Sequence, residues 1–202
     1  MISENVIYKN LYITKKEFVL LKFALLGLLE YESKTGYEIK QTMDQSTGYF
    51  WHAKQSQIYT TLKKLEQEEL VKSHLEPQER RPDRRVYTIT ESGEKALQKW
   101  LLQPVTKLDT TKQLLLLKLF FSGKLEKQVL LTQLRLIRNL HEQQAELYKI
   151  KTPEFIDEIT SFQPELKQDA HLWDATRRFG KSYEKMYVHW LDETISMVEM
   201  KF

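Results

Sequence analysis

The stretch QSQIYTTLKKLE, residues 55–66, decides how the rest of the chain is interpreted. Ile58, Leu62 and Leu65 recur at the i, i+4, i+7 spacing of one helical face, which is expected to lie against a core. The remaining residues of the stretch are mostly polar. The sequence therefore predicts an amphipathic helix with one buried side and one exposed side.

The exposed side of this helix carries amide, hydroxyl and cationic groups, with no carboxylate before Glu66. Such groups read base edges and hold phosphates in the major groove of DNA. A solvated amphipathic helix has polar residues in the same places, so the flanking sequence has to distinguish the two interpretations. The residues expected on this face or at its entry are Gln55, Ser56, Gln57, Thr60, Thr61 and Lys64.

The segment that follows the helix has the pattern of a β-hairpin. Residues 71–75 and 86–89 are strand-like and flank the turn signal Pro82-Asp83. Arginines in a surface loop form a solvated charge run when nothing else accompanies them. Here a strand ties them to the polar helix, which favours contact with DNA. The arginines near the tip are Arg80, Arg81, Arg84 and Arg85.

Helical patterns lie on both sides of this hairpin. We expect helices at residues 17–30, 36–45 and 56–68, and a fourth at residues 91–103. Three helices followed by a two-stranded hairpin with a basic tip is the order of a winged helix-turn-helix. In that fold the third helix enters the major groove, and the wing can reach phosphates or the adjacent minor groove.

Local signals support these helices. Thr35 and Glu38 form a capping-box pattern at the start of the second helix, and Ser56 is the expected N-cap of the third. The aromatic run at residues 49–51 is interpreted as a packed corner, not as a platform for stacking bases. Residues 1–16 fit neither a clean strand nor a clean helix, so they are expected to form an N-terminal arm or an extra helix that packs on a partner. The inward residues expected in the fourth helix are Ala96, Leu97, Trp100 and Leu101.

Several short motifs follow one another across residues 18–103. They are Gly36-Tyr37-Glu38-Ile39, Phe50-Trp51-x-Ala53-Lys54-x-Ser56-Gln57-Ile58-Tyr59, Leu62-Lys63-Lys64-Leu65, Val86-Tyr87-x-Ile89-Thr90-x-x-Gly93 and Trp100-Leu101. Each motif is weak alone, but their order and spacing together are specific. In this arrangement the chain resembles the PadR family of bacterial transcriptional regulators.

Two residues depart from the pattern of that family. Thr60 stands where the family usually has proline, which a first helical turn tolerates, so the change frees a hydroxyl without breaking the helix. Glu69 stands where the family usually has glycine. If that position requires a left-handed backbone, a residue other than glycine costs about 1 kcal/mol there. Thr60 also means that base specificity cannot be carried over from relatives.

The second half of the chain is expected to be entirely helical. Residues 109–121 are strongly apolar, residues 125–150 carry one apolar face, and a short helix is expected at 154–160 after Pro153. One helix is predicted from 165 to 202, about 57 Å long. It outruns any core that the chain can build alone, so its stripe is expected to pack on a second copy. The stripe comprises Leu166, Ala170, Trp173, Thr176, Phe179, Tyr183, Tyr187, Trp190, Thr194 and Met197.

The resemblance extends to function. It implies a mainly α protein with a small β-hairpin: a winged-helix DNA-binding domain at residues 1–105 and an all-helical dimerisation domain at 106–202. It also implies a homodimeric repressor that leaves a pseudo-palindromic operator when a small effector binds, in the most similar relatives a phenolic acid. No effector-binding residues are assigned, because the aromatics Trp51, Trp100, Trp173 and Tyr183 are interpreted as core.

The residues expected to contact DNA combine the helix face, the wing and the family motif. No cofactor, metal or membrane partner is expected. The full set is Lys54, Gln55, Ser56, Gln57, Tyr59, Thr60, Thr61, Lys63, Lys64, Arg80, Arg81, Arg84 and Arg85.

The composition and the remaining motifs argue against other classes of protein. Hydrophobic residues make up 41% of the chain, the net charge is only +3, and cysteine is absent, which suits a reducing cytoplasm and rules out thiolate zinc sites. The segment at residues 18–29 is too short to span a bilayer. His141 begins a metalloprotease-like pattern, but Ala145 replaces its second histidine, so an enzyme is not expected. The remaining alternative is a dimeric winged-helix module that binds protein. The basic residues of the predicted helix face and wing argue against this alternative.

Overall fold

The computed structural model describes residues 15–48, 50–78, 83–107 and 113–202. The chain divides into two compact units, unit 1 at residues 1–107 and unit 2 at residues 108–202. The predicted arm at residues 1–16 lies almost entirely outside the described residues, as do Arg80 and Arg81.

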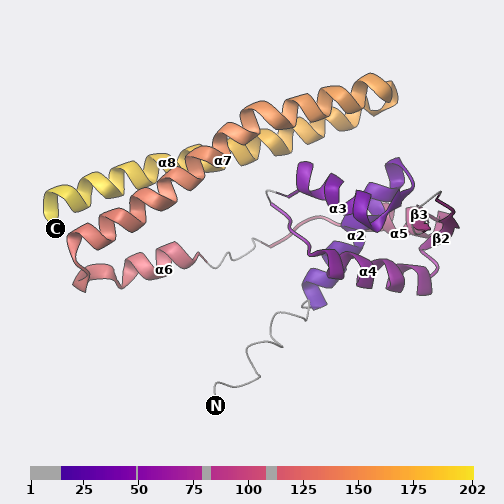
Figure 1. Ribbon diagram of the computed structural model, residues 1–202, viewed down its shortest axis with the longest axis horizontal. Helices are drawn as coiled ribbons and strands as arrows, with labels where there is room; N and C mark the ends of the chain where they lie inside the picture. Colours follow the sequence, from indigo (N-terminus) through magenta and orange to yellow (C-terminus); the bar gives the residue numbers. More distant parts are fainter. Residues whose placement is uncertain (1–14, 49, 79–82, 108–112) are drawn as a thin grey trace, which may run out of the picture. The chain divides into compact units, whose positions relative to one another are not determined.

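Unit 1 contains four helices and a small antiparallel sheet within its described residues (Figure 1). The sheet has the strand order β1-β3-β2, and the register of β2 on β3 runs from Val71 opposite Ile89 to Glu76 opposite Arg84. The elements are α2 (Lys15–Tyr31), β1 (Lys34–Thr35), α3 (Gly36–Gln45), α4 (Gln55–Gln67), β2 (Val71–Glu76), β3 (Arg84–Ile89) and α5 (Glu91–Leu101).

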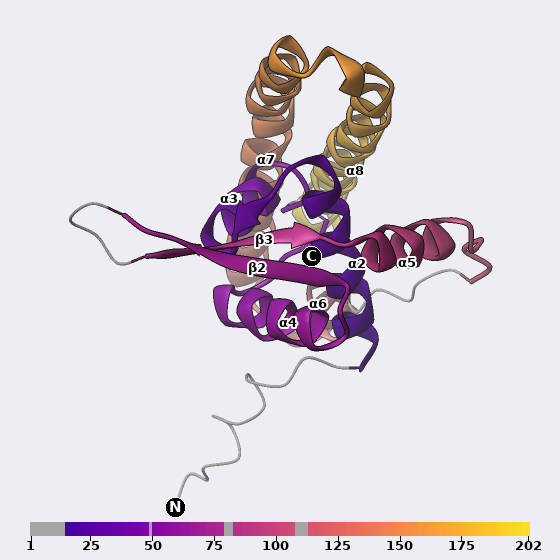
Figure 2. The same cartoon turned by 90° about the vertical axis from the view of Figure 1, so that its right-hand side faces the viewer.

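One apolar core joins these elements. Leucines of α2 meet the inner faces of α3 and α4, and the sheet and α5 close the cluster. Figure 2 shows β2 and β3 crossing in front of the helices, with α3 and α4 on opposite sides of the ribbon. This arrangement confirms the predicted mainly α fold of winged-helix type. The fully buried side chains include Leu25, Leu26, Leu29, Ile39, Ile58, Leu62 and Leu65.

The predicted capping box at the start of α3 is confirmed. The backbone N–H of Thr35 donates to the Glu38 carboxylate over 2.7 Å, and the N–H of Glu38 donates to the Thr35 hydroxyl over 3.2 Å. Thr35 also pairs with Val86 of β3 through the short strand β1, which the sequence interpretation missed. The cap therefore lies at the junction of α3 and the sheet.

Three local predictions in unit 1 were wrong. The N-cap of α4 is Lys54, not Ser56, because the helix begins one residue earlier, at Gln55. Leu101 is 66% exposed, since α5 ends there after burying Leu97 and half-burying Trp100. Phe50 is 54% exposed, so of the described residues of the aromatic run only Trp51 packs against the core.

Unit 2 is built on two long helices that lie side by side (Figure 1). Lys127 at the start of α7 donates to the backbone carbonyl of Glu199 near the end of α8, so the pair is antiparallel. The core of this pair contains Leu134, Tyr187 and Leu191 among others. The elements are α6 (Leu114–Phe120), η1 (Ser122–Lys124), α7 (Lys127–Phe162), η2 (Pro164–Leu166) and α8 (Lys167–Lys201).

The long C-terminal helix is confirmed, but the predicted helix break at Pro153 was wrong. Pro153 does not end a helix, since α7 continues through it to Phe162, and the side chains of Tyr148 and Ile156, on both sides of the proline, are buried. Within one chain, α8 buries Tyr187 and Thr194 of the predicted stripe and leaves Phe179 and Met197 exposed, as expected of a stripe that packs partly on a second copy. The buried residues of α8 are Gly180, Glu184, Tyr187, Leu191, Thr194, Ile195 and Val198.

Glu69 adopts a left-handed backbone with a φ of 58°, directly after α4. We therefore expect Glu69→Gly to raise the free energy of unfolding by about 1 kcal/mol, because glycine adopts this conformation without a clash of its side chain. Thermal and urea unfolding measure the change. Glu68→Gly is the control: Glu68 has a φ of −85°, so glycine gains nothing there, and equal effects of both changes would contradict the interpretation.

Candidate nucleic-acid interface

The outer face of α4 is polar and open to solvent. Lys54, Ser56, Thr60 and Lys63 are exposed, and the side chain of Tyr59 is 45% exposed. No carboxylate occurs in the helix before Glu66. The structure thus brings together most of the residues that the sequence assigned to this face.

Gln57 has a structural role in addition to its place on this face. Its side-chain oxygen accepts a hydrogen bond from the backbone N–H of Lys54 over 2.8 Å, which caps the start of α4. The hydroxyl of Thr60 donates to the carbonyl of Ser56 over 2.8 Å. In the free protein the first turn of the helix is therefore stabilised by side chains that could also face a base.

Tyr59 is positioned by a glycine of the preceding helix. A Cβ atom placed on Gly36 would lie 2.5 Å from the ring of Tyr59, so only glycine allows the phenol to approach the start of α3 this closely. The next residue, Tyr37, is 59% exposed, and its hydroxyl accepts from Gln41 over 3.1 Å. Tyr37 was named in a family motif but was not among the residues expected to contact DNA.

Thr61 does not belong to the exposed face, and its assignment as a DNA contact was wrong. Its side chain is fully buried, three residues after Ile58 and beside Leu62 and Leu65 in the core. Its hydroxyl has no hydrogen-bond partner among the described residues. The buried arc of α4 is therefore wider than the three apolar residues that defined it in the sequence.

Lys64 lies at the edge of this face, beside α2. Its ammonium group is 4.1 Å from the centre of the Phe18 ring, within the range of a cation–π contact. The neighbouring Lys22 forms an ion pair with Glu68. Lys64 is exposed, but in the free protein its ammonium group already contacts the Phe18 ring of α2.

The two described wing arginines point to opposite sides of β3, as the alternation of a strand requires. Arg85 donates to the Ser73 hydroxyl over 3.0 Å and lies 3.8 Å from the carboxylate of Glu66 in α4. Arg84 donates to Glu76 over 2.7 Å and to Glu38 of α3 over 3.4 Å. Both were assigned to DNA from the sequence, and both have carboxylate partners in the free protein.

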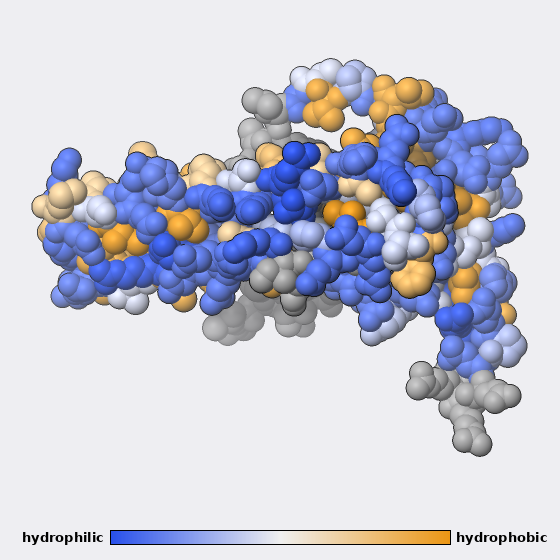
Figure 3. Space-filling view, turned by 90° about the horizontal axis from the view of Figure 1, so that it is seen from above, coloured by the Kyte–Doolittle hydropathy of each residue, from blue (hydrophilic) through white to orange (hydrophobic). Residues whose placement is uncertain are grey.

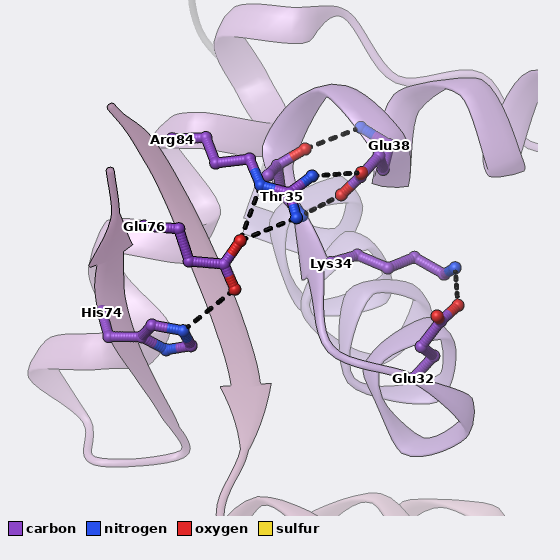
Figure 4. A network of polar contacts seen from close by, with 7 residues as sticks. All are labelled: Glu32, Lys34, Thr35, Glu38, His74, Glu76 and Arg84. Carbon is purple, nitrogen blue, oxygen red and sulfur yellow. Dashed lines mark hydrogen bonds and ion pairs between the residues drawn. The ribbon is translucent and has the colours of Figure 1, made fainter. Parts of the chain in front are cut away.

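Figure 4 shows the network around Arg84 from close by. The pKa of Glu38 is lowered, first by the hydrogen bond from the backbone of Thr35 and further by the charges of Arg84 and Lys34. The pKa of Glu76 is lowered first by its hydrogen bond from Arg84 and also by His74. Both carboxylates are therefore held in the ionised form that binds a guanidinium group.

Unit 2 contains a separate polar cluster that the sequence did not predict. The His141 ring stacks on Tyr187 with centroids 4.0 Å apart, and its Nδ1 contacts the buried carboxylate of Glu184. Gln113 bridges the hydroxyls of Tyr183 and Tyr187, and burial raises the pKa of Tyr187. His141 thus serves packing, and the described residues contain no group of three side chains suited to a metal ion.

Comparison with known proteins identifies the family. A model of the transcriptional regulator PadR-like family matches residues 25–99, and a model described as the C-terminal part of virulence activator alpha matches residues 111–199. The negative transcriptional regulator PadR of Bacillus subtilis is 30% identical over 184 residues, which cover 89% of this chain and 97% of that protein. The chain belongs to the PadR-like family.

Two solved structures of Bacillus subtilis PadR are similar to this PadR-like chain. The complex with operator DNA gives a TM-score of 0.75 at 27% identity and covers 89% of this chain and 97% of that one. The complex with p-coumaric acid gives a TM-score of 0.56 at 28% identity, covering 89% and 98%. The family consists of transcriptional regulators, not of enzymes, and no described helix is long and apolar enough to cross a membrane.

The unpaired hydroxyl of Thr61 gives a test of its corrected position. We expect Thr61→Val to leave the free energy of unfolding unchanged or to raise it by up to about 1 kcal/mol, because a buried hydroxyl without a partner is replaced by a methyl group. Chemical denaturation measures the change. Thr60→Val is the matched control on the exposed face, and a loss of stability in Thr61→Val alone would show that the buried hydroxyl has a partner.

Proposed function

We propose that this PadR-like regulator binds double-stranded operator DNA as a homodimer, with α4 in the major groove. The observation that carries the proposal is the exposed face of α4, which has donors and cations but no carboxylate before Glu66. Phosphates and base edges are bound by such groups. The operator complex of the Bacillus subtilis relative supports this assignment.

The proposed DNA contacts follow the sequence set with two revisions. Thr61 is withdrawn because it is buried, and Arg84 is treated separately below because two carboxylates bind it. We assign unit 1 to DNA binding and unit 2 to dimerisation. The proposed contacts are Lys54, Gln55, Ser56, Gln57, Tyr59, Thr60, Lys63 and Lys64 of α4 and its entry, with Arg80, Arg81 and Arg85 of the wing.

The exposed apolar side chains of unit 2 support the proposed homodimer. Those of α6 include Phe120, 82% exposed, and Leu117, 60% exposed. On α7 a stripe repeats at spacings of 7, 4 and 7 residues, which keeps its members on one side of the helix. Figure 3 shows hydrophobic patches within the hydrophilic surface on one face of the molecule. The α7 stripe consists of Val129, Leu136, Leu140 and Leu147, each at least 42% exposed.

A dimer fixes the form of the operator. Two recognition helices related by a two-fold axis read a pseudo-palindrome, with half-sites about 34–36 Å apart or a multiple of that distance. We propose repression in the cytoplasm, released by a small effector that prefers the dimer geometry unsuited to DNA. The p-coumaric acid complex of the relative makes phenolic acids the first effectors to test.

The experiment that tests DNA binding starts from a randomised duplex library selected by the wild-type, full-length protein. An enriched pseudo-palindromic sequence supports the proposal, and its affinity is then measured by fluorescence anisotropy. Failure to enrich any sequence would overturn the proposed operator binding, and failure to bind any duplex would favour a winged-helix module that binds protein.

Gln57→Glu separates base contact from helix capping. Glutamate accepts the Lys54 N–H as glutamine does, so the cap and the stability are retained. The carboxylate cannot donate to a base and is repelled by phosphates, so we expect the affinity for the selected duplex to fall by about 1–3 kcal/mol. Gln67→Glu, at the other end of α4, has the same charge change, and an equal loss there would show that only net charge matters.

Dimerisation is tested on α6, whose exposed side chains can be changed without opening the core of unit 2. We expect the double change Leu117→Asp and Phe120→Asp to shift the protein to monomers in sedimentation, because aspartate cannot be buried unpaired in an apolar contact. Lys118→Asp on the same helix is the control and should remain dimeric. A double variant that sediments as the wild type does would exclude α6 from the interface.

A further inference from the structure

We propose that Arg84 is a positioning residue that braces the wing against the start of α3, and that it does not contact DNA phosphate. The proposal rests on the proposed operator binding, since it concerns how the wing is held for that purpose. It differs from the assignment made from the sequence, where all four wing arginines were expected to contact DNA.

The guanidinium group of Arg84 is already occupied on two sides. Its Nε and one terminal nitrogen both lie 2.7 Å from Oε2 of Glu76, directly opposite in the register of β2 and β3. Its other terminal nitrogen donates to Oε1 of Glu38 over 3.4 Å. Two carboxylate partners fix the orientation of the guanidinium group. A single contact with phosphate does not require that orientation to be fixed.

Glu38 connects this arginine to the frame of unit 1. Its second oxygen accepts the backbone N–H of Thr35 over 2.7 Å, and Thr35 both caps α3 and pairs with β3. The sequence of contacts Thr35–Glu38–Arg84–Glu76 therefore links the first turn of α3 to both strands of the wing (Figure 4). His74 extends the network by contacting Glu76 over 3.3 Å.

The residues around the link between the wing and α3 are mostly polar. A cavity of about 360 Å³ lies beside the network, and its lining is polar except for Val86. Apolar packing is therefore sparse between the outer part of the wing and α3. The ion pairs are the contacts that fix this part of the hairpin, and because they are partly exposed each is worth a modest amount.

The opposite face of β3 is attached in the same way to a different helix. Arg85 reaches Ser73 and Glu66, and Glu66 belongs to the last turns of α4. The hairpin is thus tied to α3 through Arg84 and to α4 through Arg85. Of the two contacts that reach a helix, Arg84–Glu38 at 3.4 Å is shorter than Arg85–Glu66 at 3.8 Å, and Arg84 is also held by Glu76 across the hairpin, so the brace is assigned to it.

Two substitutions distinguish a brace from a phosphate contact. Lysine can replace arginine at a phosphate, but as a point charge it cannot hold two carboxylates in fixed geometry. Glu38→Gln keeps one acceptor for the Thr35 N–H and so preserves the capping box, but it places an NH₂ group toward Arg84. If Arg84 contacted phosphate, Glu38→Gln would free it and strengthen DNA binding.

The experiment measures binding of the full-length variants to the selected duplex and to a scrambled duplex by fluorescence anisotropy, at temperatures where thermal unfolding shows all variants folded. We expect Arg84→Lys, Arg84→Ala and Glu38→Gln each to weaken binding to the selected duplex about two- to fivefold for each wing that contacts it. Combining Arg84→Ala with Glu38→Gln should weaken it no further, because both changes remove one link.

Glu32→Gln is the matched control, since Glu32 pairs with Lys34 and not with Arg84. It removes the same charge close to the network but outside the contacts of Arg84, and it should not weaken binding. The proposal is overturned if Arg84→Lys binds as the wild type does, or if Glu38→Gln binds at least as tightly as Glu32→Gln. A wild-type protein that selects no sequence would instead reject the proposed function, so the two failures are distinguishable.

Discussion

The burial of one side of α4 is the constraint on which the rest of unit 1 depends. Ile58, Leu62 and Leu65 are fully buried or nearly so against α2 and α3. Turning the helix by one residue would rotate it by about 100° and expose these side chains, at a cost of about 1.5–3 kcal/mol for each. The rotation of the helix is therefore fixed, and with it the set of polar side chains that can face DNA.

The orientation of the wing depends on the same core at its inner end and on ion pairs at its outer end. Val86, Tyr87 and Ile89 are the buried side chains of β3, whereas in its described outer part the alternating arginines make the contacts with the helices. A strand sends successive side chains to opposite faces, so neighbouring arginines reach different helices. In this way a single dipeptide relates the hairpin to both helices of the helix-turn-helix, although neither partner is near it in sequence.

Periodicity and turn chemistry sufficed to predict the helices of unit 1, the hairpin and the capping box, since each depends on residues close together in the chain. The errors depend on distant contacts. Thr61 is polar, yet it lies at the edge of the buried arc, and its side chain is buried with the core residues of α4. Pro153 carries a local signal for a helix end, which packing on α8 overrides. Of the carboxylate partners of Arg84, Glu76 follows from the register of the hairpin, whereas Glu38 comes from 46 residues away, so no local pattern could have paired it with Arg84.

The exposed apolar surface of unit 2 follows from the geometry of a helix pair. Two helices cover only one side of each other, and the α7–α8 core is concentrated where Leu130 to Leu134 meet Tyr187 to Val198. Additional apolar side chains on α6 and along α7 have no counterpart to bury them among the described residues of one chain. In the proposed two-fold dimer the same patch of each chain would face its counterpart on the partner. A chain of this size could then present a long apolar stripe without a third layer of its own.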